Sequence, residues 1–391
     1  MALATRSTSR PRAPVGNLRS NPASPLHHID VALVASTIAV AGLGLLMIYS
    51  ASKGGLAADG LSTLTYVKRQ GLFLVGGIGI MALATVVDYR WIRDMSPFLY
   101  GGTLVLLLAV LSPLGTAVRG AKSWFAVGPF QLQPAEFGKV TLILLLATYC
   151  AQHRGDMDLR RLVAALGIFA LPAGLIMLQP DLGSTLVYIA IVMGVLLVAG
   201  ARPKQIVAIS AAGVVAVSLT LAVGVVELKD YQKDRFGAFL ESGEVDPGGA
   251  GYNQEQSKTA VANGGWFGQG IGNGTQTRLG FVPEQQTDFI FTVVGEELGF
   301  VGSATLLLLY AAMGWRIWHA ARVAKDMFGT LVCAGVLAML VFQVFESVGM
   351  AMGIMPVTGI PLPFLSYGGS SLLTMFCAVG LVLNVHMRRF T

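Results

Sequence analysis

Ionisable side chains that interrupt long apolar runs are the residues of this sequence whose types and spacing could support chemistry. Asp288 directly follows Thr287 at the start of such a run. Thr287 suits a helix N-cap, so Asp288 is either an ordinary residue of a first helical turn or a carboxylate placed as a general base. Glu136 and Lys139 lie three residues apart, which puts them on one helical face and allows an ion pair. That spacing fits a structural pair and a substrate-binding pair equally well.

Basic and aromatic residues gather in a short segment ahead of that pair. Arg119, Lys122 and Trp124 precede Gln133 within residues 114–133. The combination fits an interfacial anchor, and it also fits a docking site for a lipid diphosphate. Asp181 lies in a tight turn between two apolar runs, where helix capping is the more common role of an aspartate.

Three further carboxylates lie deeper in the apolar runs. Glu296 and Glu297 are adjacent, so on a helix they point about 100° apart and do not easily face one polar cavity. Glu346 lies in a later run. Bonds to neighbouring helices are the interpretation that we favour for these carboxylates, and a hydrated path is the alternative.

The elements that position these residues belong to a membrane protein. Among the 391 residues, 54% are hydrophobic and only 12% are charged, whereas soluble domains carry about 25% charged residues. The mean hydropathy is +0.67, and the 48 glycines are an excess that membrane helices tolerate. This composition excludes a soluble enzyme, a disordered protein, a disulfide scaffold and a coiled coil.

Ten apolar runs are long enough to cross a bilayer as helices, which takes about 20 residues each. The sequence therefore predicts an all-α polytopic membrane protein. Both termini are expected to be cytoplasmic, because Lys and Arg are enriched in the segments that this orientation places inside. Residues 1–28 are predicted to be a disordered basic cytoplasmic arm, and residues 29–391 a single transmembrane domain. The predicted spans are 31–50, 71–87, 97–113, 134–151, 162–178, 182–199, 205–226, 288–318, 328–353 and 368–387.

The connection between predicted spans seven and eight, residues 227–286, is the longest and is expected outside. Loops of this length are uncommon unless they have a function, so we expect chemistry on the extracytoplasmic face. Its glycine-rich stretch 268–274 lacks the spacing of a phosphate cradle and is predicted to be a flexible loop. The uncharged segment 356–369 is predicted to be a rigid re-entrant turn packed on protein.

The sequence gives no evidence of a metal site or of a nucleic-acid-binding site. The three cysteines lie in apolar runs, the five histidines form no cluster, and no Cys/His spacing resembles a metal site. The net charge of +6 is carried by single residues and pairs between apolar runs. That pattern is typical of membrane orientation and not of nucleic-acid binding.

Four strings resemble the signatures of the SEDS family, which contains RodA, FtsW and a sporulation homologue, SpoVE. They are residues 133–139 (QPAEFGK), 179–184 (QPDLGS), 283–291 (PEQQTDFIF) and 361–371 (PLPFLSYGGSS). Their order and the ten-span layout agree with the family over nearly the whole chain after residue 28. The resemblance implies a bacterial peptidoglycan glycosyltransferase of the cytoplasmic membrane. Such a protein polymerises lipid II, the undecaprenyl-diphosphate-linked disaccharide pentapeptide, on the outer face and works with a class B penicillin-binding protein.

The resemblance also implies roles for individual residues. Asp288 falls on the leading catalytic candidate of the family. Because the donor is α-linked to diphosphate and the product bond is β, one inversion is required, with a base at the acceptor hydroxyl and a cation at the diphosphate. No cofactor is expected, although Asp288 with the substrate diphosphate could hold Mg²⁺ or Mn²⁺. The candidate substrate-binding residues are Lys139, Glu136, Arg119, Lys122, Trp124, Gln133, Asp181 and Ser366.

Other functions stay open at this point. The strings 283–285 and 295–299 favour a RodA-like role in elongation over an FtsW-like role in division. A transporter that flips lipid II would depend on Glu296 and Glu297 more than on Asp288. A scaffold that only recruits the transpeptidase would depend on the outer loop and on the lipid-facing surfaces of spans eight and nine.

Overall fold

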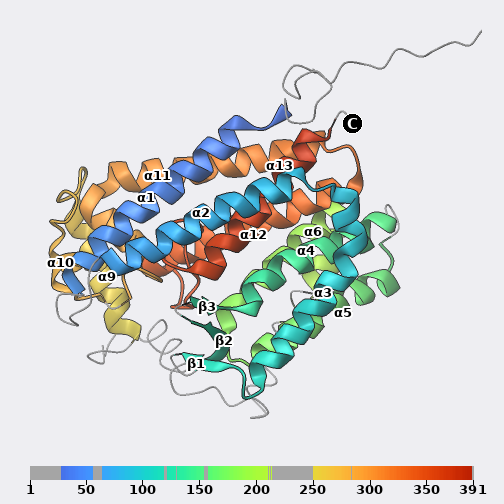
Figure 1. Ribbon diagram of the computed structural model, residues 1–391, viewed down its shortest axis with the longest axis horizontal. Helices are drawn as coiled ribbons and strands as arrows, with labels where there is room; N and C mark the ends of the chain where they lie inside the picture. The colour runs from blue at the N-terminus through green and yellow to red at the C-terminus, as the bar shows by residue number, and fades with distance from the viewer. Residues whose placement is uncertain are drawn as a thin grey trace, which may run out of the picture.

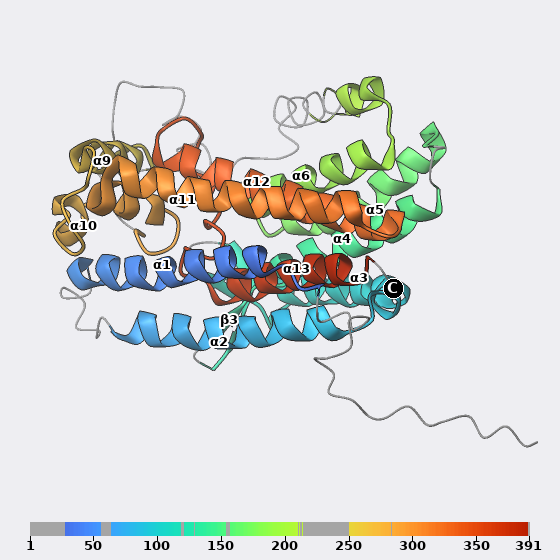
Figure 2. The same cartoon turned by 90° about the horizontal axis from the view of Figure 1, so that it is seen from above.

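The computed structural model is a bundle of long helices with a small group of shorter elements at one end (Figures 1 and 2). It describes residues 28–55, 64–118, 121–128, 130–153, 157–209, 211, 213, 250–282 and 284–389. Within these ranges nine helices are long and apolar enough to cross a membrane. They correspond to nine of the ten predicted spans. The predicted arm 1–28 and most of the predicted span 205–226 lie outside the described residues.

Most of the nine helices begin and end within a few residues of the predicted boundaries, but α2 and α3 begin seven and eight residues earlier than predicted. Aspartate side chains cap the first turns of several of them, and a proline occupies the first turn of another. The helices are α1 (Val31–Gly55), α2 (Leu64–Val86), α3 (Tyr89–Leu111), α4 (Pro134–Gln152), α5 (Leu159–Met177), α6 (Leu182–Ala199), α11 (Ile290–Val323), α12 (Met327–Ala351) and α13 (Gly369–Met387).

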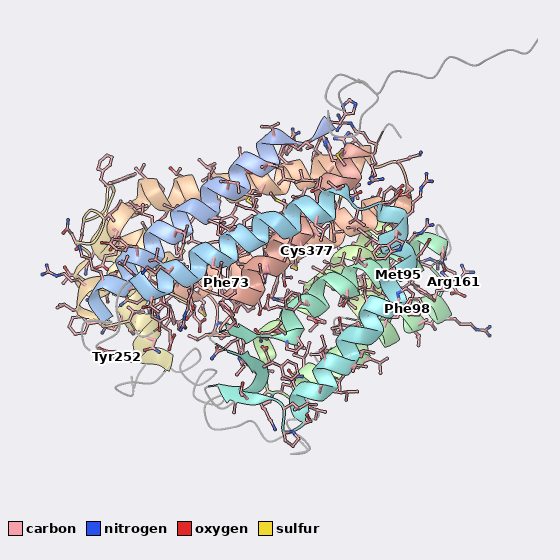
Figure 3. The ribbon with its side chains drawn as sticks, in the orientation of Figure 1. Phe73, Met95, Phe98, Arg161, Tyr252 and Cys377 are labelled. Atoms are coloured by element: carbon pink, nitrogen blue, oxygen red, sulfur yellow. The ribbon has the colours of Figure 1, made fainter. Side chains whose placement is uncertain are left out.

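Helix α13 lies at the centre of the bundle and is the most buried of the nine, while α2, α3 and α5 expose much of their apolar surface. It packs most extensively on α2. Small residues allow this close approach: a Cβ on Gly77 would lie 2.3 Å from the Phe376 ring, and one on Gly369 would lie 2.4 Å from the Phe73 ring. Phe73 is visible on α2 near the middle of Figure 3.

Both ends of the described chain lie at the same end of the bundle. The backbone oxygen of His28 bonds to the His386 imidazole at 3.1 Å. Asp30, just before α1, pairs with Arg316 of α11 at 2.7 Å. We call this end the inner side and the opposite end the outer side.

The outer side carries a feature that the sequence did not predict. Residues 114–133 were expected to be a loop, but they fold into three strands, β1 (Thr116–Val118), β2 (Ala121–Val127) and β3 (Phe130–Leu132). The strands form an antiparallel sheet in the order β1-β2-β3. The Phe130 ring contacts Phe73 of α2 at 5.3 Å between centroids, which fixes the sheet against the bundle.

The long outer connection is also more ordered than predicted. It contains α9 (Ala250–Gly264) and α10 (Thr275–Leu279), which lie beside the start of α11 and the end of α1 (Figure 1). The stretch predicted to be a flexible loop is held in place, because Gln269 and Gly270 donate backbone hydrogen bonds to Glu296 and Glu297 of α11. The stretch is a loop as predicted, and its first part is bound to α11 through the backbone.

These bonds are available because α11 is broken at Gly299, which has φ +66°. The break frees backbone groups on both sides of it, and such groups must find partners within protein at membrane depth. Phe300 and Val301 donate to the oxygens of Gly265 and Trp266 at 2.9 and 3.0 Å. A Cβ on Gly299 would lie 2.3 Å from the Gly268 nitrogen, so the two segments meet only through glycine.

Two contacts between α1 and α11, one near each end of the bundle, allow a distance along the bundle axis to be estimated. Asp30 and Arg316 pair at the inner side, and Ser50 donates to the Glu297 carboxylate at 2.6 Å at the outer side. At a helical rise of 1.5 Å per residue, these two levels are about 28–30 Å apart. That distance equals the hydrocarbon thickness of about 30 Å. Taking the Asp30–Arg316 pair as the inner boundary of the hydrocarbon places Glu297 near the outer boundary.

Candidate active site

Asp288 lies in the turn that precedes α11 and not in the helix itself. The helix begins at Ile290 and has Phe289 as its N-cap residue, so the prediction that Thr287 caps a helix opened by Asp288 is wrong. Thr287 instead donates to the Glu284 carboxylate at 3.2 Å. The Asp288 nitrogen donates to the Glu284 oxygen at 3.2 Å, and Asp288 is half-buried.

The segment before Asp288 is joined to the turn that precedes α13. The Tyr367 nitrogen donates to the Gln286 oxygen at 2.8 Å. Gln70 of α2 holds the same turn from the other side, because its amide donates to the Ser366 oxygen at 3.1 Å and accepts from the Gly368 nitrogen at 3.3 Å. The turn is therefore fixed by two distant parts of the chain.

Ser366, a predicted substrate-binding residue, is only 5% exposed. Its hydroxyl accepts the Leu362 nitrogen at 2.9 Å, so it shapes its own loop. The loop is packed on protein as predicted: Leu362 and Leu365 are buried, and Tyr310 of α11 donates to the Pro363 oxygen at 2.5 Å.

Arg69 is a site residue that the sequence reasoning missed. Its guanidinium lies close enough to the Tyr367 hydroxyl to affect the pKa of that hydroxyl, and the Tyr66 ring meets Tyr367 edge-on at 5.0 Å. Burial raises the pKa of the Tyr367 hydroxyl and Arg69 opposes that shift, so Tyr367 stays neutral near pH 7. The sequence signal was the pair Lys68 and Arg69 near the outer end of a span, where basic residues are the exception.

The starts of three helices converge next to this turn. The Gln133 nitrogen before α4 donates to the Ser370 hydroxyl of α13 at 3.1 Å. Its side-chain amide donates to Asp181 at 2.9 Å. Asp181 caps α6 by accepting the Ser184 nitrogen at 2.9 Å, as its position in the tight turn predicted. We call Gln133, Asp181 and Ser370 the Gln133 cluster, and residues 284–289 the Asp288 turn. Ser370 lies three residues after Tyr367, so the Gln133 cluster and the Asp288 turn contact the same short segment.

Glu136 and Lys139 form the predicted ion pair. The Lys139 Nζ atom lies 2.6 Å from the Glu136 Oε1 atom, and the two residues are 1% and 3% exposed. Among the described residues, the Glu136 Oε2 atom has no hydrogen-bond partner. The lysine charge is therefore compensated within the protein, while one carboxylate oxygen keeps its capacity to accept.

Lys122 and Trp124 are half-buried residues of β2, two positions apart and therefore on one face of the strand. The sheet reaches the site through β3, which packs on α13. Arg119, the third residue of the predicted group, lies outside the described residues. Lys122 and Trp124 pair with β1, on the side of the sheet away from β3, so the structure does not bring them to the start of α13 and leaves the group incomplete.

The deeper carboxylates bond to neighbouring elements, as we favoured. Glu296 accepts the Gln276 and Thr277 nitrogens at 2.7 and 2.9 Å and so holds the first turn of α10. Glu297 accepts from Ser50 of α1, and Glu346 accepts from the Thr358 hydroxyl at 2.8 Å. Each carboxylate fastens a loop or helix of the outer side to the bundle.

Within the part of the chain that the structure describes, no group of three or more His, Cys, Asp or Glu residues could hold a metal ion. The chemistry that this arrangement can support is acid–base chemistry by one half-buried carboxylate, whose turn is hydrogen-bonded to the segment that Arg69 approaches. The fold and the site therefore define a polytopic helical membrane protein with a polar site at one membrane face.

Comparisons with known proteins identify its family. Residues 31–390 match the family model of FtsW, RodA and SpoVE, described as cell cycle proteins. The stage V sporulation protein E of Bacillus subtilis is 40% identical over 91% of this chain and 96% of its own length. A probable peptidoglycan glycosyltransferase FtsW of Aeromonas salmonicida is 37% identical, over 93% and 92%.

A solved structure, described as structural coordination of polymerization and crosslinking by a peptidoglycan synthase complex, is also similar. It has a TM-score of 0.79 and 32% identity, and the match covers 93% of this chain and 99% of that chain. The chain belongs to the SEDS family of FtsW, RodA and SpoVE. It is a multi-pass protein of the bacterial cytoplasmic membrane.

Proposed function

We propose that the chain is a peptidoglycan glycosyltransferase that polymerises lipid II, with Asp288 as the general base. The observation that carries the proposal is the bond between Tyr367 and Gln286, which brings the Asp288 turn to the same short segment as Arg69 and the Gln133 cluster. A carboxylate and a cation held by one shared turn are the two groups that an inverting transfer from a diphosphate needs.

The height of Asp288 above the membrane supports a lipid-linked substrate. Helix α11 rises about 10 Å from Glu297, at the hydrocarbon boundary, to its first residue. Because the headgroup region extends only about 5–8 Å beyond the hydrocarbon, Asp288 lies at its water-facing edge, a height that the sugars of a lipid-anchored donor reach. A base at this height reaches a sugar hydroxyl without pulling the lipid out of the bilayer.

In the proposed reaction, Asp288 accepts the proton of the acceptor 4-hydroxyl as that oxygen attacks the anomeric carbon of the donor. The bond from the anomeric carbon to the diphosphate oxygen breaks, and the configuration inverts from α to β. Positive charge has to support the departing diphosphate. Lys139 is a candidate substrate-binding residue from the sequence, but Glu136 already compensates its charge. Among the described residues no ion pair joins Arg69 to a carboxylate, so we assign the task to Arg69.

No resident cofactor enters the proposal. The donor diphosphate and Asp288 together offer oxygen ligands of the kind that Mg²⁺ or Mn²⁺ prefers, and such an ion would add positive charge beside the leaving group. Omitting divalent ions and adding a chelator in the polymerisation assay tests whether one is required.

The test of the proposed function uses the purified full chain, labelled lipid II and gel separation of the products, with and without a class B penicillin-binding protein. Wild type should give a ladder of glycan chains, and Asp288→Asn should give none while melting at an unchanged temperature. Asp94→Asn is the matched control, because Asp94 is an exposed carboxylate of the inner side. A full ladder from Asp288→Asn would contradict the base assignment, and no ladder from wild type would contradict the function.

We further propose a RodA-like role in cell elongation, from the sequence strings 283–285 and 295–299. An FtsW-like role in division is the second candidate, because FtsW proteins are among the relatives with more than 35% identity. Complementation separates them: expression in cells depleted of their own RodA or FtsW should restore rod shape in the first case and septation in the second.

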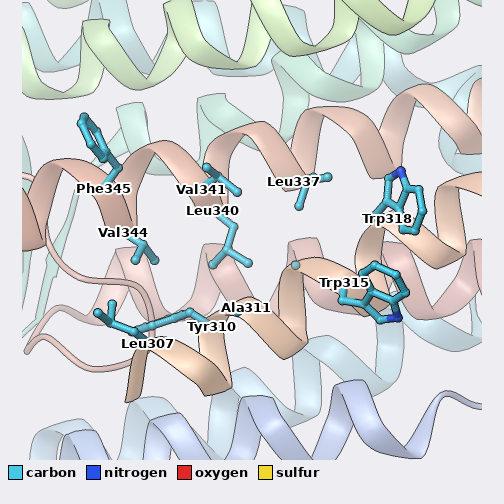
Figure 4. Close-up of a pocket in the computed structure, with 11 residues that line it drawn as sticks. Leu307, Tyr310, Ala311, Trp315, Trp318, Leu337, Leu340, Val341, Val344 and Phe345 are labelled. Atoms are coloured by element: carbon cyan, nitrogen blue, oxygen red, sulfur yellow. The ribbon is translucent and has the colours of Figure 1, made fainter. Parts of the chain in front are cut away.

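A class B penicillin-binding protein is the proposed partner, since the similar solved structure couples polymerisation to crosslinking. The surfaces of α11 and α12 that face away from the bundle form an apolar groove of about 580 Å³ between them (Figure 4). Ala311 and Gly314, the smallest residues of its lining, leave room for the backbone of one additional transmembrane helix. Ala311→Trp should reduce co-purification of the partner, whereas the same change on an opposite face, Ala82→Trp, should leave it unchanged.

A further inference from the structure

The loop that supports the break in α11 presents apolar side chains at its surface. Residues 264–274 contain no charged residue, although they lie in the long connection of the outer side. Trp266 is 69% exposed and Phe267 is 81% exposed. Exposed aromatic side chains in an uncharged segment are unusual where a protein faces water, and they are typical of a membrane interface.

Backbone bonds fix the level of this loop along the bundle. The Gly265 and Trp266 oxygens accept from Phe300 and Val301, and the Trp266 ring meets the Phe300 ring at 5.1 Å. Trp266 therefore lies level with Val301 of α11.

The level of Val301 is inside the hydrocarbon and not above it. Val301 lies about 22 Å along α11 from Arg316, whose pair with Asp30 we take as the inner boundary. Since the hydrocarbon is about 30 Å thick, Trp266 and Phe267 lie several ångströms below its outer boundary. The chain thus re-enters the membrane before α11 begins.

The exposed apolar surface of the loop continues into the lipid-facing surface of α11. Phe300 and Val301 are 60% and 45% exposed, and Leu308 further along the same helix is 69% exposed. The far end of this surface carries Trp318 with Arg322 over its ring at 4.8 Å, a pairing suited to the inner interface. The loop and the neighbouring part of α11 therefore both expose large apolar side chains.

We propose that residues 264–274 form a re-entrant membrane loop, whose Trp266 and Phe267 side chains insert among the lipids of the outer leaflet. The loop holds α9 and α10 against the membrane surface and carries the bonds that close the break at Gly299. Its ligand is the acyl-chain and glycerol region of ordinary phospholipids, because the loop has apolar and aromatic groups and no charge for a specific headgroup.

The experiment uses the full chain in phosphatidylcholine vesicles with bromine atoms near the glycerol end of the acyl chains. Trp266→Phe removes one of five tryptophans, so the difference from wild type isolates Trp266 fluorescence. Bromolipid should reduce this difference signal by about twofold or more, and aqueous iodide should leave it nearly unchanged. A difference signal quenched by iodide and not by bromolipid would overturn the proposal.

A second pair of positions covers the case in which Trp266→Phe alters the fold. Nitroxide labels are placed on Phe267→Cys and, as the matched control, on Thr259→Cys of α9, which is exposed on the same outer side. The label at 267 should collide preferentially with oxygen and the label at 259 with a water-soluble nickel chelate. Equal access of the chelate to both sites would refute insertion. Protection of site 267 only after a partner protein is added would show a protein-docking surface instead and would also refute it.

Discussion

Replacing Arg69 by glutamine removes the cation beside the Asp288 turn while keeping a polar side chain of similar length. In the structure Arg69 lies close to the Tyr367 hydroxyl and has no carboxylate ion-pair partner among the described residues. A hydrogen bond to a charged group contributes about 1.5–3 kcal/mol. Loss of one such contact to the diphosphate therefore predicts a fall in kcat/KM of about ten- to a hundredfold.

The neighbouring lysine provides the matched control. Lys68 is exposed on the same helical turn of α2 as Arg69, and Lys68→Gln changes the net charge by the same amount. Screening over about 8 Å at physiological salt limits its long-range effect, so its kcat/KM should change less than about threefold. Arg69→Lys should fall between the two, since a lysine keeps the charge but loses the paired donors.

The assay measures initial rates of lipid II polymerisation and the inhibition constant of undecaprenyl diphosphate, which carries the diphosphate without the sugar. Arg69→Gln should raise that constant by the same ten- to hundredfold factor, about 1.5–3 kcal/mol, and Lys68→Gln should not. Equal constants for the two variants, both folded by thermal melt, would refute the assignment of Arg69. Because wild type still polymerises in that case, the failure would leave the proposed function intact.

Three further predictions concern the elements that hold the site. Removing one partner of the buried pair, by Glu136→Gln or Lys139→Met, should destabilise the protein by about 3–5 kcal/mol in thermal or denaturant unfolding, whereas the double variant should be less destabilised than either single one. Glu296→Ala leaves buried backbone donors of α10 without an acceptor, so hydrogen exchange in residues 275–279 should speed up by at least about tenfold, and unchanged exchange would contradict the capping role. Gly299→Ala should prevent normal folding, because a Cβ there meets the loop backbone, while Gly79→Ala in open space on α2 should be neutral, both judged by yield and monodispersity in detergent.

Hydropathy alone determined the architecture of the described part of the chain. Each of its nine spans is a long apolar run, and a run of that length in a bilayer has no stable alternative to a helix. Contacts between residues close in sequence were equally predictable. The ion pair of Glu136 and Lys139 and the cap formed by Asp181 depend only on spacing within one turn.

Contacts between distant segments decided the rest. No local pattern announces that Tyr367 bonds to Gln286, that Arg69 reaches Tyr367, or that a glycine loop fills the break at Gly299. These contacts form because backbone groups left open in the membrane must be satisfied by whichever segment the packing of the helices brings near. The sequence therefore named Asp288 as the candidate base, and only the tertiary structure showed which cation lies beside its turn.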